Sequence, residues 1–272
     1  MKPISLISAV EAAGVRYVLM DIDDTITTRG KLSSEAFTAL WRLHEAGLRV
    51  VPITGRPAGW CDLIAREWPA DGVVGENGAF AFWEENGILR QEFHPNAVRN
   101  DHHALRRIRE RALAEVPGVR VAKDQFSRLF DLALDFAEEE PVLTLDAAKQ
   151  IQAIAIQEGA MAKISSIHVN IWMGKYDKLS MSELFLQKYC GWKKSEAIGT
   201  AASVPPLNEI IFVGDSPNDE PMFAHFPLAC AVANIRRYVE LLKDPPAFVS
   251  REECGGGFAE IAQTLLEKRK RG

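Results

Sequence analysis

Short apolar runs alternate with stretches of helical periodicity through the first part of the chain. Each run has the length of a buried strand, and each helical stretch carries apolar side chains on one face. We expect strands at residues 16–20, 48–53 and 71–74, a helix at 35–46 capped by Ser33 or Ser34, and a second helix that ends near Trp68. Strands that alternate with helices through short loops predict a parallel sheet covered by helices on both faces.

The pattern changes after about Phe93. A long, highly charged helical stretch is followed by two strand-like segments with a helix between them, and three short strands come later. The expected helices are 96–116 and 145–158, and the expected strands are 127–137, 164–172, 209–213, 228–232 and 247–249. We therefore expect an α/β protein with a doubly wound, Rossmann-like parallel sheet. Its core would comprise residues 1–94 and 173–272, and residues 95–172 would form an inserted α/β domain.

Composition narrows the class of protein without naming an activity. The 272 residues are 47% hydrophobic and 25% charged, and 32 basic against 37 acidic residues leave a net charge of −5. This balance argues against a nucleic-acid partner. No apolar run has the length of a membrane span, the first residues do not resemble a signal peptide, and the four cysteines are widely spaced. We expect a cytoplasmic protein without a membrane partner, and the pattern does not indicate an oligomeric state.

Acidic residues directly follow two of the expected strands. The sequence DIDDT at 21–25 follows the first strand, and GDSPND at 214–219 follows the strand at 209–213. The carboxyl ends of parallel strands meet at one edge of a sheet, where ligands bind. One such cluster alone could be a solvated acidic turn. Two of them predict a divalent-metal site, and their oxygen ligands favour Mg²⁺.

Two further positions carry groups that can bind phosphoryl oxygens. Thr54 ends the second strand with a hydroxyl donor, and the amide of Gly55 can point the same way. Lys178 precedes a helical stretch at 179–189, and taken alone it would be interpreted as a surface lysine.

Four motifs stand in the order known from one protein family. They are DIDDT at 21–25, ITGR at 53–56, DKLS at 177–180 and GDSPND at 214–219. In these motifs and their strand contexts the chain resembles the phosphohydrolases of the haloacid dehalogenase-like superfamily. The segments ENGA at 76–79, CAVAN at 230–234 and GGGFAE at 255–260 are similar to its sugar-phosphatase branch, which includes Cof-like, sucrose-phosphatase-like and mannosyl-3-phosphoglycerate-phosphatase-like proteins. Asp24 and Leu179 depart from the family, which often has glycine there, and Lys175 is the alternative to Lys178.

The resemblance implies a Mg²⁺-dependent phosphatase that acts on a small phosphorylated metabolite of the sugar-phosphate class. Asp21 would attack phosphorus to form an aspartyl-phosphate, and Asp23 would protonate the leaving group and then activate water. The carboxylate of Asp21, the carbonyl of Asp23 and Asp215 would bind Mg²⁺.

The resemblance also implies roles for the residues around this centre. Thr54, Gly55 and Lys178 would bind the phosphoryl oxygens. Asp219 would orient Lys178 or a metal-bound water. Ser216 and Asn218 would support the loop at 214–219 that carries Asp215 and Asp219.

Residues 95–172 are expected to act as a cap that closes over the site, admits a small molecule and excludes macromolecules. The alternating strand at 164–172 places His168 and Asn170 on one face, where they could contact a sugar or form a solvated sheet surface. Arg56 could touch substrate or form a structural salt bridge.

Two alternatives to a phosphatase stay open at this point. A phosphosugar mutase would use the same Asp21 and Asp23, but would return the phosphoryl group to a sugar hydroxyl instead of water. A non-catalytic phosphometabolite-binding protein would be expected to have lost Asp21, Asp23 or Asp215, all of which are present.

Overall fold

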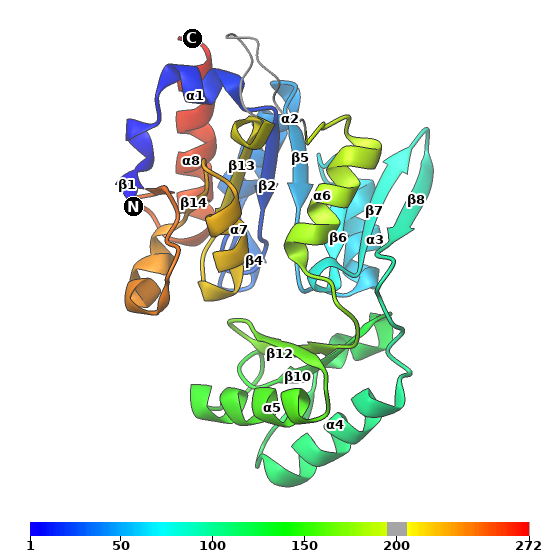
Figure 1. Cartoon of the computed structure of the whole chain (residues 1–272). Helices are drawn as coiled ribbons and strands as arrows, with labels where there is room; N and C mark the ends of the chain where they lie inside the picture. The colour runs from blue at the N-terminus through cyan, green and yellow to red at the C-terminus, as the bar shows by residue number, and fades with distance from the viewer. Residues whose placement is uncertain (195–205, 272) are drawn as a thin grey trace. The chain divides into compact units, whose positions relative to one another are not determined.

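The computed structural model describes residues 1–194 and 206–271, which form two compact units. The first unit comprises Met1–Ile53, Glu67–Val73 and Ser182–Gly272, and the second comprises Thr54–Arg66 and Val74–Met181. Figure 1 labels the helices and strands of both units. The expected division into residues 1–94 with 173–272 and an inserted 95–172 stays a prediction, because the second unit also contains segments that precede residue 95.

The first unit is built on a six-stranded sheet in which every neighbouring pair of strands is parallel. Its order is β1 (Lys2–Pro3), β15 (Phe248–Val249), β14 (Cys230–Ala231), β13 (Ile210–Gly214), β2 (Tyr17–Met20) and β5 (Arg49–Pro52). This sheet confirms the α/β fold class. Five of the expected strands, at 16–20, 48–53, 209–213, 228–232 and 247–249, lie in this sheet.

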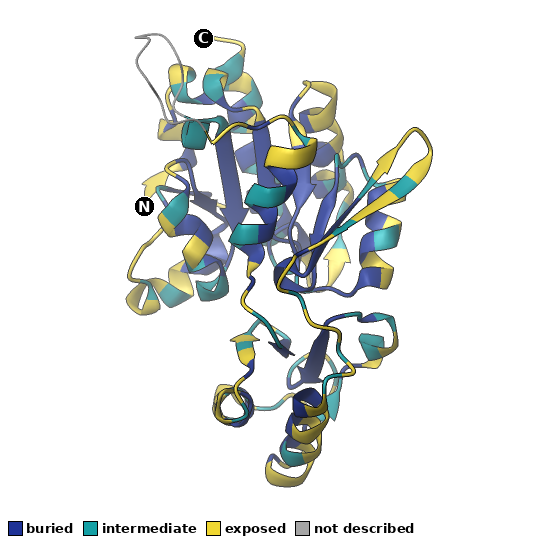
Figure 2. Ribbon diagram, turned by 45° about the vertical axis from the view of Figure 1, so that its right-hand side comes forward, coloured by how far each residue is buried: buried dark blue, intermediate teal, exposed yellow. Residues whose placement is uncertain are grey.

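Helices cover this sheet and bury its central strands. They are α1 (Ala9–Gly14), α2 (Ser34–Glu45), α7 (Glu220–His225) and α8 (Cys254–Arg269), and α8 packs against α1 and α2. The N-cap of α2 is Ser33, whose side chain accepts the N–H of Ala36. Every residue of β2 and β13 is buried, as the dark ribbons of Figure 2 show. Such continuous apolar strands are typical of a parallel sheet covered on both faces.

The second unit contains a four-stranded antiparallel sheet. Its order is β11 (Met161–Ile164), β12 (His168–Trp172), β10 (Asp131–Asp135) and β9 (Arg120–Val121), and two helices, α4 (His103–Glu115) and α5 (Leu145–Gln157), pack with it. Ile108, Ile151 and Val169 lie in one apolar core shared by the helices and the sheet. The helix expected at 96–116 begins later than predicted, at His103 behind the N-cap His102.

Two hairpins complete the described sheets. The strands β6 (Val73–Gly75), β7 (Phe80–Glu85) and β8 (Ile88–Phe93) form a three-stranded sheet, and β3 (Thr27–Thr28) pairs with β4 (Lys31–Leu32). The strand expected at 71–74 therefore exists within this three-stranded sheet, and the N–H groups of Asp71 and Thr54 donate to the carbonyls of Val50 and Val74, both at 2.8 Å, alongside β5. It pairs with β7 because a tight loop at 76–79 returns the chain directly alongside it.

Two helices continue from one unit into the other, α3 (Ala58–Glu67) and α6 (Lys178–Tyr189). The short 3-10 helices are η1 (Ile4–Leu6), η2 (Glu76–Gly78), η3 (Lys123–Ser127), η4 (Pro206–Glu209), η5 (Pro217–Asp219) and η6 (Ala233–Leu241). Within the described residues, none of these helices combines the length and the apolar character that crossing a membrane would require.

Candidate active site

Two acidic segments emerge from neighbouring strands of the first unit. Asp21 follows β2 and Asp215 follows β13, and these strands pair in parallel with Met20 opposite Val213. The N–H of Asp21 donates to the carbonyl of Val213 at 2.9 Å, which extends the pairing by one residue. Two carboxylates 194 positions apart in the sequence are thereby placed at one edge of the sheet, as the strand ends predicted.

Asp219 is the third member of this acidic group. Asp21, Asp215 and Asp219 are all buried, and each offers a carboxylate oxygen within 4.8 Å of the others. The helix η5 turns the chain so that Asp219 Oδ2 accepts the N–H of Asp215 at 3.2 Å. Gly214 permits this approach, because a Cβ there would overlap the Asp219 carboxylate. The sequence had assigned Asp219 only a supporting role, and the structure places it with Asp21 and Asp215, two of the three predicted metal ligands.

The electrostatics of this group favour a bound cation. Burial raises the pKa of the Asp215 carboxyl well above its usual range, and the nearby carboxylates of Asp219 and Asp21 raise it further. The hydroxyl of Ser216, 3.0 Å from Asp215 Oδ1, acts in the opposite direction. Buried carboxylates at this spacing are stabilised by a hard cation with oxygen ligands, so the residues fit a divalent ion such as Mg²⁺.

The loops that carry these carboxylates are held by their own hydrogen bonds. Ser216 Oγ also lies within hydrogen-bonding distance of Asn218 Oδ1, so both predicted supporting residues do contact the acidic loop. Asp24 has a positive φ of 56°, its N–H donates to Thr27 Oγ1, and its carbonyl accepts from Asn234 Nδ2. Asp23 is partly exposed, and its carboxylate is not in the three-membered group.

Thr54 and Lys178 belong to the second unit, where both are buried. Thr54 Oγ1 accepts the N–H of Arg56 at 3.0 Å, which leaves the hydroxyl hydrogen able to donate elsewhere. Lys178 is the first residue of α6 and only 7% exposed, so the interpretation as a surface lysine is wrong. Their place beside the acidic group stays a prediction from the sequence.

Arg56 and His168 are paired through a residue that sequence reasoning missed. Arg56 Nη1 lies 2.9 Å from Glu138 Oε1, and His168 Nε2 lies 2.7 Å from Glu138 Oε2. The hydrogen bond with His168 lowers the pKa of Glu138 to about 2, and Arg56 contributes to the decrease. The Arg56 guanidinium also stacks over Trp60, 4.4 Å from the ring centroid. The salt-bridge alternative for Arg56 is therefore present in the structure.

Asn170 belongs to a second buried network that reaches Gly55. Its Nδ2 donates to Asp131 Oδ2 at 3.0 Å and to the Gly55 carbonyl at 3.3 Å. Arg128 Nη1 donates to the same carbonyl at 2.9 Å and to both oxygens of Asp131 at 3.0 Å, and its other nitrogens form a bidentate pair with Asp124. Asn170 is as buried as its strand neighbours, so a solvated sheet face was the wrong alternative. Asp131 and Arg128 were not predicted, although a charge inside an apolar strand is a usable signal.

Glu76 is fully buried and also escaped sequence reasoning as a functional position. Its carboxyl oxygens accept the backbone N–H groups of Ala58, Leu129, Phe130 and Asp131 at 2.6–3.1 Å. Burial raises the pKa of Glu76 to about 8, Asp131 adds to the rise, and the N–H groups of Leu129 and Phe130 oppose it. Glu76 therefore ties the loop after β6 to the start of β10.

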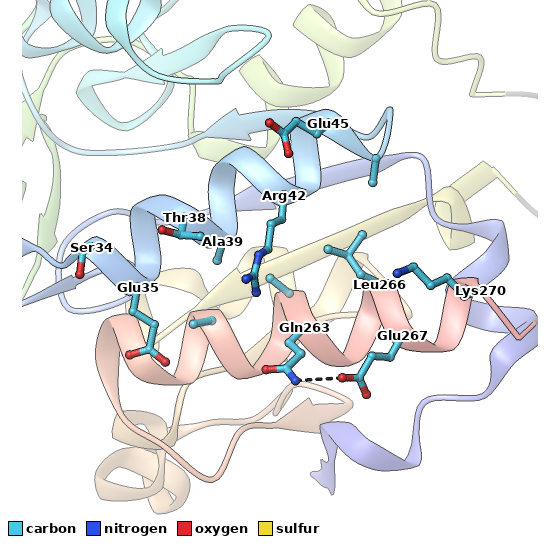
Figure 3. Close-up of a pocket in the computed structure, with 13 residues that line it drawn as sticks. Ser34, Glu35, Thr38, Ala39, Arg42, Glu45, Gln263, Leu266, Glu267 and Lys270 are labelled. Carbon is cyan, nitrogen blue, oxygen red and sulfur yellow. Dashed lines mark hydrogen bonds between the residues drawn. The ribbon is translucent and has the colours of Figure 1, made fainter.

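A separate surface hollow of about 640 Å³ lies between α2 and α8 of the first unit. Figure 3 shows Arg42 of α2 extending toward Gln263 of α8, and Gln263 Nε2 donates to Glu267 Oε1. None of the residues that line it comes from the four motifs.

Part of the sequence matches a known protein family. Residues 18–115 match the model of the haloacid dehalogenase-like hydrolases. The match covers 98 of the 272 residues, and in this region the chain is similar to haloacid dehalogenase-like hydrolases. The matched region includes Asp21, Thr54 and Glu76, and it ends before Lys178 and Asp215. A comparison with curated proteins finds no match to this sequence.

Solved structures share the fold of this chain over nearly its whole length. A protein from Thermoplasma acidophilum is 19% identical, with a TM-score of 0.69, and the alignment covers 93% of this chain and 98% of that one. A haloacid dehalogenase-like hydrolase from Bacteroides thetaiotaomicron is 16% identical, with a TM-score of 0.64 and coverages of 92% and 99%. The sucrose-phosphatase from Synechocystis sp., solved with sucrose and phosphate, is 12% identical, with a TM-score of 0.60 and coverages of 92% and 97%. These similarities establish the fold.

Proposed function

We propose that this protein is a Mg²⁺-dependent phosphatase that hydrolyses a small phosphorylated metabolite of the sugar-phosphate class through an aspartyl-phosphate. The observation that carries the proposal is the buried group of Asp21, Asp215 and Asp219 at the carboxyl ends of β2 and β13. Its first member opens a motif inside the region that matches the hydrolase family. A phosphatase in this family needs a nucleophile and a cation site, and this group supplies residues for both.

The proposed reaction has two steps, each a displacement at phosphorus accompanied by a proton transfer that involves Asp23. A carboxylate oxygen of Asp21 attacks phosphorus, the bond from phosphorus to the leaving oxygen breaks, and Asp23 gives that oxygen a proton. Asp23 then takes a proton from water, whose oxygen attacks phosphorus and releases phosphate and the free Asp21 carboxylate. The Asp21 and Asp215 carboxylates and the Asp23 carbonyl would hold Mg²⁺, which neutralises charge on the phosphoryl oxygens.

Charge stabilisation must provide most of the acceleration. Uncatalysed hydrolysis of phosphate monoesters is slow enough that enzymes accelerate it by up to about 10²¹-fold. General acid–base catalysis contributes only about 10²–10⁴. Thr54, Gly55 and Lys178 are proposed to donate hydrogen bonds to the phosphoryl oxygens. Asp219, beside Asp215, would help to orient the cation site.

The substrate class is argued from charge and from the sugar-phosphatase relatives. The sucrose-phosphatase in the comparison was solved in complex with sucrose and phosphate, which supports a sugar-phosphate substrate here. A net charge of −5 disfavours polyanionic nucleic acids as substrates. Residues 95–172 are proposed to cap the site, and the compartment is proposed to be the cytoplasm.

The test is phosphate release from a panel of phosphorylated sugars and related metabolites, with Mg²⁺ or with EDTA. We expect Mg²⁺-dependent release from a few sugar phosphates. Asp21→Asn should reduce turnover at least about 1,000-fold while the protein stays folded, because the variant loses only the nucleophile. Asp24→Asn is the matched control, since it makes the same change three residues away in the same loop.

Two outcomes would overturn parts of the proposal. Substantial turnover by Asp21→Asn would exclude the aspartyl-phosphate route. No release from any substrate by folded wild-type protein would reject the phosphatase. Phosphorus NMR of the products would then reveal whether the phosphoryl group moves within a sugar, as a mutase requires.

A further inference from the structure

The turn Glu76–Gly78 has no part in the mechanism above, yet its backbone adopts an unusual conformation. Glu76, Asn77 and Gly78 have consecutive positive φ angles of 44°, 56° and 105°. Two of these residues are not glycine, so the conformation is unfavourable on its own and must be imposed by neighbours. The four backbone N–H groups that donate to the Glu76 carboxyl supply that constraint. Strain of this kind concentrates at functional sites.

One side of the turn contacts the Thr54–Gly55 segment. The N–H of Asn77 donates to the carbonyl of Thr54 at 3.0 Å. A Cβ built on Gly55 would lie 3.2 Å from both polar atoms of the Asn77 side chain and 3.5 Å from Asn170 Oδ1. The Asn77 amide therefore packs against the position where a side chain on Gly55 would begin, in the segment proposed to bind phosphoryl oxygens.

The other side of the turn contacts the second phosphoryl-binding segment. A Cβ on Gly78 would overlap the carbonyl of Asp177 and lie 2.9 Å from the backbone nitrogen of Lys178. The turn thus touches both segments of the second unit that carry proposed phosphate ligands: Asn77 contacts the Thr54–Gly55 segment, and Gly78 contacts the Asp177–Lys178 segment.

The side chain of Asn77 is buried without satisfying its hydrogen-bonding capacity. It is 7% exposed, and its Nδ2 has no hydrogen-bond partner among the described residues. Buried polar groups are almost always paired, so an exception calls for a functional explanation. An amide N–H is a donor that suits an oxyanion, and the neighbouring donors are those proposed for a phosphoryl group.

We propose that the side-chain amide of Asn77 donates a hydrogen bond to the phosphoryl group of the substrate, beside Thr54 and Lys178. This inference rests on the proposed function and adds a phosphate ligand to it. The hydrogen bond goes to a charged acceptor, and removing one such donor lowers the rate of comparable enzymes by about 10²–10³-fold when it acts in the transition state.

The backbone angle of Asn77 allows a clean set of variants. Asparagine, aspartate and glycine are the residues that tolerate a positive φ best, so Asn77→Gly and Asn77→Asp should both keep the turn. Asn77→Gly removes the amide. Asn77→Asp keeps the shape and replaces the donor with a group that repels phosphate. Asn86→Gly is the matched control, because Asn86 has a φ of 54° in the exposed turn between β7 and β8.

Steady-state kinetics and inhibition by inorganic phosphate test the proposal. We expect Asn77→Gly to lower kcat/KM at least about 10-fold and to weaken phosphate inhibition, Asn77→Asp to lose more, and Asn86→Gly to match the wild type. Melting temperatures of all three should stay within a few degrees of the wild type. A kcat/KM and an inhibition constant within twofold of the wild type in Asn77→Gly, or in Asn77→Asp if the glycine variant does not fold, would overturn the proposal.

Direct binding separates this proposal from the proposed function. If the wild type hydrolyses no phosphomonoester, titration of wild type and Asn77→Gly with inorganic phosphate by calorimetry still tests Asn77. At least 10-fold weaker binding by the variant would support the phosphate ligand although the phosphatase had failed. Equal affinities, or no binding by the wild type, would overturn it.

Discussion

Arg128 connects the four-stranded sheet of the second unit to the Thr54–Arg56 segment, and its replacement by methionine should destabilise the protein strongly. The Arg128 side chain is fully buried. Its guanidinium pairs with Asp124 at 2.9 Å and Asp131 at 3.0 Å and also donates to the Gly55 carbonyl. Both carboxylates raise the pKa of Arg128 and outweigh the lowering by burial, so it is charged at any accessible pH. Arg128→Met has a similar length and removes every one of these donors.

The expected magnitude follows from the groups left behind. The Asp131 side chain is fully buried, and Asp124 is largely so. Removing one partner of a buried pair costs about 3–5 kcal/mol, because the remaining charge stays desolvated and uncompensated. Arg128→Met leaves two carboxylates without this partner, which would increase the loss of stability. Asn170 still donates a hydrogen bond to Asp131 in the variant, and this reduces the loss. We expect Arg128→Met to lower the free energy of unfolding by about 3–5 kcal/mol.

Urea unfolding followed by circular dichroism measures this loss. Arg111→Met is the control, because Arg111 also contacts two carboxylates, Glu115 and Glu158, but from the exposed face of α4. It should change the free energy of unfolding little. Adding Asp131→Asn to Arg128→Met should recover part of the loss, since it removes a buried charge. A loss below about 1 kcal/mol in Arg128→Met, or no recovery in the double variant, would refute the reasoning from uncompensated buried charge.

Three further perturbations test other parts of the molecule. The pKa of Glu138 is depressed to about 2, so its stabilising contribution is full above the usual carboxyl pKa and is lost as the pH falls from about 5 toward 2. Glu138→Gln should remove that part of the pH profile of urea unfolding, and an unaltered profile would contradict the ion pair. Gly78→Ala should lower the melting temperature by at least about 4 °C, because the added Cβ would overlap the Asp177 carbonyl; an unchanged value would mean that the turn relaxes. Asp215→Asn should remove most of the rise in melting temperature that Mg²⁺ produces, and an undiminished rise would exclude Asp215 as a ligand.

The acidic group was predictable because it depends on strand ends alone. Once β2 and β13 are recognised as neighbouring parallel strands, the residues that follow them must emerge at the same edge. The closeness of Asp219 to Asp215 depends instead on the 3-10 turn η5 and on Gly214, which the apolar pattern does not encode. The motif therefore indicated the residue but not its distance.

The networks of the second unit could not be predicted from periodicity. Glu76 meets Leu129 and Phe130 across more than 50 residues of chain, and Arg128 meets Gly55 across 73. No local pattern reports such contacts. The β7–β8 hairpin was different, because its Asn86-Gly87 turn, with both φ angles positive, is a recognised hairpin signal that the sequence reasoning had overlooked.

The anchoring of Glu76 limits how this protein can be recombined with its relatives. Three of the four backbone N–H groups that its carboxyl accepts come from residues 129–131, inside the segment predicted to set substrate preference. A chimera that exchanged residues 95–172 alone would have to reproduce those three donors and the Arg128 and Asn170 contacts to Gly55. A graft that also carries residues 54–58 and 74–94 would transfer both sides of these contacts, so the natural unit of exchange is larger than the insertion.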